Sequence, residues 1–149
     1  MRRGLRHPDP AVRVGCCRVL DHFLDEEAVP ELIENLQHKE GSVRAWAMHA
    51  LACDRCKEST CRSAEDEVVP IATRMLLEDG SRRVRQMAAA LVGAVVHRRP
   101  NVIAALEHAR DHDPHPVVRK IASWYTPGGP IYQRLAPKPS KKRRGPLPA

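Results

Sequence analysis

Residues 79–88 read Asp-Gly-Ser-Arg-Arg-Val-Arg-Gln-Met-Ala, a turn that leads into an apolar helical stretch. The centre of this segment is the dipeptide Val84-Arg85, with the small residue Ala88 following the arginine by three positions. Asp and Ser in the turn are residue types that cap the first turn of a helix. The apolar residues that follow are spaced by three and four, so the segment predicts a helix with one buried face.

The same pattern occurs four times along the chain. The copies are Val12-Arg13 with Cys16, Val43-Arg44 with Ala47, Val84-Arg85 with Ala88, and Val118-Arg119 with Ala122. They follow one another at intervals of 31, 41 and 34 residues, counted from valine to valine. Periods in this range are typical of arrays in which one small structural unit stacks on the next.

Between the copies lie further amphipathic patterns, which begin at Val29, Val69 and Val102. We expect Pro30 and Pro70 in the first turns of these helices, where the missing N–H has no helical partner. The chain therefore alternates between two kinds of helix, and each Val-Arg helix is paired with the helix before it.

These residues resemble the HEAT repeat family, in particular the compact bacterial form of the phycobilin-lyase type, whose motif is Asp-Pro-x-Val-Arg followed by spaced Ala and Leu. The resemblance covers about 120 residues and implies an all-α, right-handed superhelix, or HEAT-like solenoid, of about 3.5 helical hairpins. It also implies an open curved face for a partner. The segment before Asp9 is too short for a full outer helix, so we expect an incomplete first repeat whose exposed apolar edge makes a dimer plausible.

Composition agrees with an all-α class in a single domain. The chain has 149 residues, of which 42% are hydrophobic and only 3% aromatic, so Ala, Val and Leu must fill the core. The net charge of +7 is concentrated after residue 126, where six basic residues and no acid occur. We expect residues 1–126 to form the array and residues 127–149 to be a disordered basic tail rich in Pro, Lys and Arg.

We recognise neither a targeting signal nor a membrane-spanning segment in the sequence. No apolar run follows the basic residues at Met1–Arg6, and the longest apolar stretch, residues 87–96, is half of what a membrane helix needs. Five cysteines without an export signal favour a reducing compartment. We expect a cytoplasmic protein without membrane contact.

A cysteine-rich segment at residues 53–62 accounts for the longer middle interval. Cys53 and Cys56 have the spacing with which two thiolates bind one ion, Cys61 follows, and His49 lies one helical turn before Cys53. These four residues predict a structural zinc site of the Cys₃His type.

Other interpretations of the same cysteines stay open: a loop with incidental thiols, a redox switch, or an iron–sulfur cluster that would need another ligand. Cys16 takes the position of the repeat alanines, and we expect core packing for it and a place at the core border for Cys17.

The motif arginines Arg13, Arg44, Arg85 and Arg119 have two interpretations, an anion-binding stripe or a structural ladder. An acid precedes each by four to six residues, namely Asp9, Glu40, Asp79 and Asp113. We favour a ladder of Arg–carboxylate hydrogen bonds between neighbouring repeats.

Candidate partner contacts are Trp46, Arg82, Arg83, Arg98 and Arg99. Trp46 is either a cover for the metal site or an anchor for a partner. The arginines of the third repeat are either solvated helix ends or phosphate contacts, and the tail would add salt-sensitive attraction to acidic partners. Trp124 and Tyr125 are expected to close the last repeat against the turn at residues 127–130.

Catalytic motifs do not stand out: no phosphate-binding Gly loop, serine elbow or carboxylate pair is recognisable. HEAT-repeat iron hydroxylases use His-Glu pairs, whereas this chain has the reversed Glu107-His108. The leading hypothesis is a non-catalytic adaptor that binds a protein. The alternatives are a nucleic-acid-associated protein using the tail and the third-repeat arginines, and a thiol redox sensor or accessory subunit of an enzyme.

Overall fold

The computed structural model describes residues 1–23, 25–52 and 64–138, and the elements within them are helical. They form the helices α1 (Arg2–Leu5), α2 (Pro10–His22), α3 (Val29–Asn35), α4 (Gly41–Ala52), α5 (Glu65–Glu78), α6 (Arg82–Ala94), α7 (Ile103–His112), α8 (Pro116–Tyr125) and α9 (Pro130–Leu135). Short 3-10 turns, Glu26–Ala28 and Pro100–Val102, lead into α3 and α7. The Val-Arg copies begin α2, α4, α6 and α8, as expected from the sequence.

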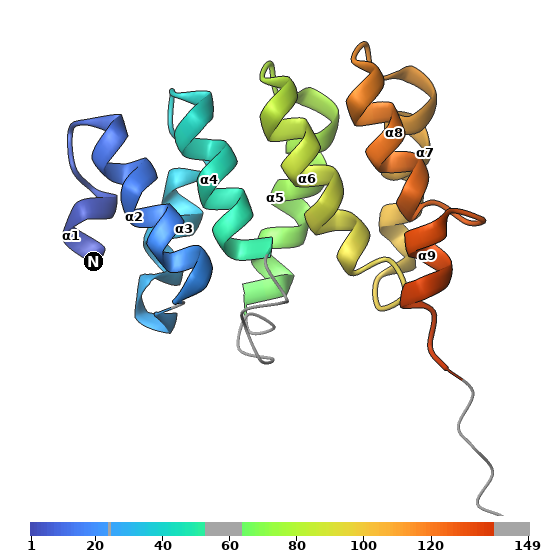
Figure 1. The fold of residues 1–149 in the computed structure, drawn as a ribbon, viewed down its shortest axis with the longest axis horizontal. Helices are drawn as coiled ribbons and strands as arrows, with labels where there is room; N and C mark the ends of the chain where they lie inside the picture. The colour runs from blue at the N-terminus through green and yellow to red at the C-terminus, as the bar shows by residue number, and fades with distance from the viewer. Residues whose placement is uncertain (24, 53–63, 139–149) are drawn as a thin grey trace, which may run out of the picture.

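The helices form an open row of pairs, with α1 and α9 at opposite ends (Figure 1). The Val-Arg helices pack side by side in the order α2, α4, α6, α8, and each also packs against its partner, α1, α3, α5 or α7. We call α2, α4, α6 and α8 the inner helices, and α3, α5 and α7 the outer helices. This packing between neighbours is that of an α-solenoid, which confirms the expected fold class.

The core lies between the two layers and is built from the repeated positions. Val43, Val84 and Val118 are completely buried, as are the alanines three residues after each motif arginine. Val12 of α2, the first inner helix in the described residues, is 38% exposed. The first repeat thus has the exposed apolar edge that the sequence predicts, which Val19 and Phe23 extend, and dimerisation through it stays a prediction.

Helix α5 corrects the prediction for Pro70. The helix begins at Glu65, so Pro70 lies inside it and not in its first turn. Three consecutive acids, Glu65, Asp66 and Glu67, occupy the first turn, where negative side chains favour the helix terminus. Their effect extends the helix toward its N-terminus, while Pro70 leaves the carbonyl of Asp66 without an N–H partner.

The ordered array also extends beyond residue 126. A turn with Gly128 at a positive φ of 88° leads into α9, and Tyr132 of α9 packs against the core. The Nε2–H of His97 donates to the carbonyl of Tyr132 at 2.7 Å. Part of the segment expected to be a disordered tail is therefore a capping helix, and residues 139–149 lie outside the described part of the chain. None of the described helices combines the length and apolar character needed to cross a membrane.

Candidate functional site

The middle two motif arginines join neighbouring repeats through carboxylates. Arg44 donates from Nε and Nη2 to both carboxylate oxygens of Asp79, at 2.8 and 2.7 Å. Arg85 binds Asp113 in the same way, at 2.7 and 3.1 Å. The third nitrogen of each guanidinium donates to backbone carbonyls in its own repeat, including that of Asp79 for Arg85. All three nitrogens are engaged, so these arginines act as links between repeats.

Electrostatics at the Arg85–Asp113 pair favour the charged state. Burial alone acts to raise the pKa of the Asp113 carboxyl, but hydrogen bonds from Arg85 and from the His115 N–H outweigh burial and hold that pKa below its usual range. The hydrogen bonds to Asp113 raise the pKa of Arg85 in turn. Both side chains are buried, so each depends on the other for its charge to be compensated.

At the ends of the row the ladder changes its acceptor. Arg13 donates to the side-chain oxygen of Asn35 at 2.8 Å and to the carbonyl of His7 at 2.6 Å. Arg119 donates to the carbonyl of Asp113 at 2.8 Å. These two arginines use neutral acceptors in place of the expected carboxylates.

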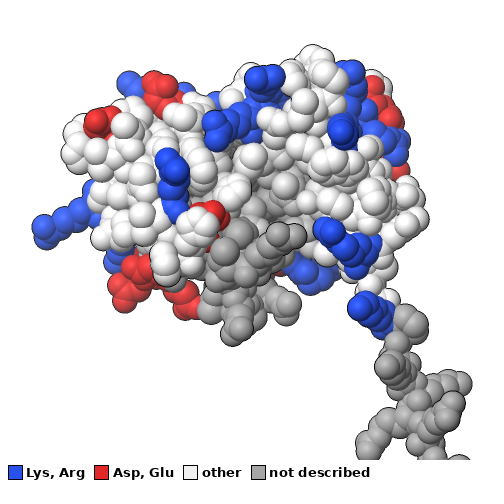
Figure 2. Space-filling view, in the orientation of Figure 1, with Lys and Arg blue, Asp and Glu red and all other residues white. Residues whose placement is uncertain are grey.

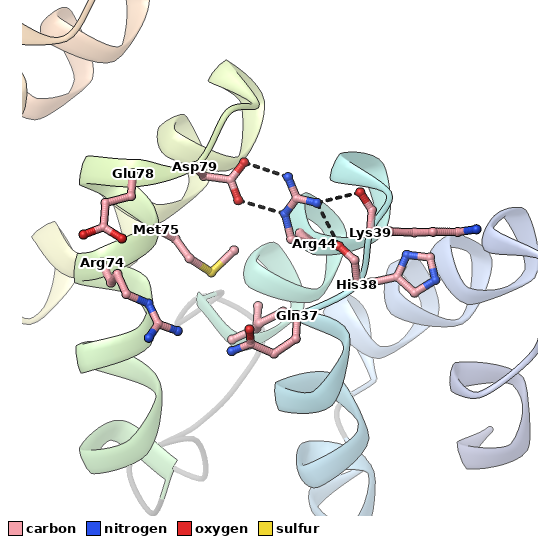
Figure 3. Close-up of a pocket in the computed structure, with 9 residues that line it drawn as sticks. Gln37, His38, Lys39, Arg44, Arg74, Met75, Glu78 and Asp79 are labelled. Carbon is pink, nitrogen blue, oxygen red and sulfur yellow. Dashed lines mark hydrogen bonds and ion pairs between the residues drawn. The ribbon is translucent and has the colours of Figure 1, made fainter.

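Two surface hollows lie along this ladder. One of about 310 Å³ is lined by the Arg44–Asp79 pair and by Leu36, Gln37, His38, Lys39, Arg74, Met75 and Glu78 (Figure 3). The other, of about 260 Å³, contains Arg85 and Asp113 in the equivalent place between α5 and α7. Because the guanidinium in each hollow is already bound to an aspartate, we interpret the hollows as gaps between packed repeats rather than as ligand sites.

The inner helices are strongly basic. Their sequences contain eight Lys or Arg residues and a single acid, Asp21, which is only 5% exposed. Four of the eight are the motif arginines of the ladder. The other four are exposed cations: Arg18 on α2, Arg82 and Arg83 on α6, and Lys120 on α8.

The outer helices have the opposite charge. Among α3, α5 and α7 there are eight acids and two basic residues, Arg74 and Arg110. The acids are Glu31, Glu34, Glu65, Asp66, Glu67, Glu78, Glu107 and Asp111. The two layers of the solenoid therefore separate charge by side, which a net charge of the whole chain does not reveal.

We call the exposed side of α2, α4, α6 and α8 the inner face. Figure 2 looks onto this face and shows separate groups of Lys and Arg on it, several of them in its upper part, with Asp and Glu mostly toward its margins. Trp46 of α4, the second of the four inner helices, is half-buried.

Two arginines from neighbouring repeats lie against the Trp46 ring. The guanidinium of Arg18 is 5.3 Å from the ring centroid, and that of Arg83 is 5.6 Å from it. The His49 ring contacts the same indole edge-on, with 5.5 Å between the two ring centroids. On α8, the ammonium of Lys120 lies 5.8 Å from the Trp124 ring. Such cation–π contacts hold a cation in place without neutralising it.

The last repeat is closed by Tyr125 and by the turn after α8, whereas Trp124 contacts Lys120. The Tyr125 ring lies so close to Gly93 of α6 that a Cβ on that glycine would overlap it. Burial raises the pKa of the Tyr125 phenol. Gly129 likewise approaches the carbonyls of Ser123 and Trp124.

The third-repeat arginines do not form one cluster. Arg82 and Arg83 begin α6, while Arg98 and Arg99 follow its other end, about 20 Å away by the rise of a helix. Arg98 binds Glu65 at 3.0 Å, and Arg99 binds Glu65 at 2.8 Å and also Asp66. Arg98 and Arg99 are therefore engaged with the first turn of α5, whereas Arg82 contacts the ring nitrogen of His115 at 2.6 Å.

Of the predicted metal ligands, only His49 falls in the described residues, since Cys53, Cys56 and Cys61 lie outside them. The Nδ1 atom of His49 is 3.1 Å from Oδ1 of the buried Asp21, though the two are not aligned as a hydrogen bond. His22 approaches the other oxygen of Asp21 at 3.9 Å. Within residues 1–23, 25–52 and 64–138, no group of three metal-binding side chains occurs.

The two remaining cysteines exchange the roles expected from the sequence. Cys17 is completely buried in the core, and burial raises the pKa of its thiol to about 12. Cys16 is only partly buried and lies against Gly4 of α1. The thiol of Cys17 stays protonated at neutral pH and is unsuited to redox exchange.

Comparison with known proteins supports the repeat assignment. Residues 2–60 match the family model of HEAT repeats. No curated protein and no solved structure matches the chain. The class that the fold defines is the α-solenoid of paired helices. The matched segment contains the first two Val-Arg helices, and the match supports the HEAT repeat resemblance that the four copies indicate.

Proposed function

We propose that this chain is a non-catalytic scaffold that binds another protein through its inner face. HEAT repeats commonly mediate protein interactions, and their stacked inner helices provide an extended surface. The observation that carries the proposal is the charge separation: the inner face has exposed cations, while the acids of the layers lie on the outer helices. Uncompensated charge on one side favours a partner of opposite charge.

Site-specific crosslinking tests the face that is used. A photoreactive amino acid placed at Gly15 or Lys120 of the inner helices should give a discrete crosslinked polypeptide in cells. The same residue at Glu67 or Ala104, which are exposed on outer helices, should give little. Crosslinks from the outer positions alone would contradict the proposal. If nuclease treatment removes the crosslinked products of the inner positions, the nucleic-acid alternative is favoured. Against that alternative, Arg98 and Arg99, which it would use, are already paired with acids.

We also propose that His49, Cys53, Cys56 and Cys61 bind a structural zinc ion. The sequence spacing supports this, and so does the carboxylate of Asp21 beside Nδ1 of His49. A metal-bound histidine commonly has a carboxylate at its second nitrogen, which would leave Nε2 of His49 for the ion. The ion would fix the end of α4 next to the inner face.

Elemental analysis of the purified protein tests the zinc site. We expect about one zinc per chain, and we expect Cys56→Ser to lose the metal and to lower the Tm. Cys16→Ala, which changes a cysteine outside the set to the residue found in the other repeats, should keep both. A metal-free protein whose Tm is unchanged by Cys56→Ser would refute the site.

A further inference from the structure

We propose that the inner face recognises an acidic protein segment with interspersed apolar side chains, held by Arg18 and Arg83 on either side of Trp46. This inference rests on the scaffold function proposed above and specifies the partner's chemistry. It starts from the arrangement of three consecutive inner helices, α2, α4 and α6, each of which contributes one residue to the group.

The cations of this group are available for a partner. In the part of the chain that the structure describes, Arg18, Arg82, Arg83 and Lys120 form no ion pair within 4.0 Å. The arginines of the ladder and of the α5–α6 region, in contrast, are bound to acids or carbonyls. Among the described residues, an arriving carboxylate therefore has no acid to displace at Arg18 or Arg83.

The Trp46 ring also prepares these arginines for binding. A guanidinium that lies against an indole loses part of its rotational freedom before any partner arrives, while its N–H donors stay at the edge of the plane. Less entropy is then lost when a carboxylate binds. The fork of each guanidinium matches the two oxygens of Asp or Glu.

An apolar side chain beside a cation favours a protein over a nucleic acid. Val117, three residues before Lys120 and on the same side of α8, is 40% exposed. A Leu or Phe side chain of an acidic segment would cover it. Nucleic acid backbones have no apolar groups to do so.

Charge density and stacking also argue against nucleic acid. Duplex DNA carries one charge per about 1.7 Å, whereas inner helices of a solenoid lie about 8–10 Å apart. The exposed cations of the described inner helices, Arg18, Arg82, Arg83 and Lys120, are thus too sparse to follow a phosphate backbone. Arg18 and Arg83 lie against the Trp46 ring, so a base would have to compete with them to stack there.

Fluorescence anisotropy with a defined peptide tests the inference on the full chain. The probe is a labelled peptide of about 16 residues that alternates Asp or Glu with Leu or Phe, measured at low and at physiological salt. We expect the double variant Arg18→Ala, Arg83→Ala to weaken binding about tenfold or more. The matched control Arg3→Ala, Arg74→Ala removes two exposed arginines of α1 and α5 and should change Kd less than about twofold.

Two comparison probes complete the experiment. We expect an Asn/Gln version of the peptide and an oligo-dT of similar charge to bind more weakly than the acidic peptide. Equal binding of the Asn/Gln version, or equal losses in the two double variants, would overturn the inference. Tighter binding of oligo-dT that depends on Arg18 and Arg83 would overturn it in favour of nucleic acid. The crosslinking experiment tests the scaffold function separately, because a crosslink at the inner face requires a bound protein but does not require that protein to be acidic.

Discussion

Asp113→Ala should lower the free energy of unfolding by about 3 kcal/mol, a large part of the stability of a domain of this size. The substitution removes both carboxylate acceptors of Arg85, whose side chain stays buried with only the Asp79 carbonyl as an acceptor and without a compensating charge. It also removes the hydrogen bond from the His115 N–H that shapes the turn before α8. Chemical denaturation at pH 7 measures the loss.

Asp111→Ala is the matched control, because Asp111 is an exposed aspartate two residues away that pairs with its half-buried neighbour Arg110. We expect a much smaller change for it. Asp113→Asn keeps an oxygen for the turn and should fall between the two variants. If Asp113→Ala were as mild as Asp111→Ala, the ladder would not link the repeats energetically.

The difference between the wild type and Asp113→Ala should depend on pH. The pKa of Asp113 is lowered in the folded protein, so its contribution is complete above the unfolded value of about 4 and is lost as the pH falls through the lower folded pKa. The stability gap should therefore narrow as the pH falls from about 5 toward 2. A gap that stays constant over this range would contradict the paired, ionised state of Asp113.

Gly93→Ala should lower the free energy of unfolding by about 2 kcal/mol, although alanine is the better helix former. The cause is the Tyr125 ring of α8, which occupies the space that a Cβ on α6 needs. Either the ring or the helix must move, and the α6–α8 contact loosens. Thermal or denaturant unfolding measures the change.

Two further variants separate crowding from helix propensity. Gly15→Ala, at an exposed position of α2 with no atom near a built Cβ, should stabilise by about 0.5–1 kcal/mol. In a Tyr125→Ala background, which removes the ring but keeps a Cβ 2.7 Å from the built position, the loss caused by Gly93→Ala should become smaller. A loss of the same size with and without the Tyr125 ring would show that the ring is not the cause.

The repeat pattern made most of the fold predictable. Val43, Val84 and Val118 have the same spacing to their arginines and turns, and they occupy equivalent buried positions. Pairing of Arg44 and Arg85 with turn acids could likewise be anticipated, since both partners recur with the repeat. Local capping and periodicity suffice to predict the position of a residue that contacts only its own or the adjacent repeat.

Contacts without a repeated pattern were not predictable in this way. Arg98 and Arg99 were expected to form one basic group with Arg82 and Arg83. Instead they form ion pairs with Glu65 and Asp66 of a neighbouring helix. Arg18 and Lys120 were missed because they lie at different motif positions, six and two residues after the motif valine. The absence of exposed acids from all four Val-Arg helices was a usable signal that the net charge concealed.

The capping helix α9 was missed for a similar reason. Residues 127–138 resemble the basic tail in composition, but Tyr132 finds a partner in His97, which lies 35 residues earlier. Composition predicts disorder only when no distant surface is available for packing. The last pair of helices supplies that surface.

An NMR titration of the isotope-labelled full chain with the acidic peptide tests most directly whether the inner face is the binding surface. We predict chemical-shift changes at the Trp46 indole N–H, at the arginine side chains beside it, and at backbone amides of α2, α4 and α6. Changes confined to residues 139–149 or to the outer helices, or no changes at all, would contradict the account.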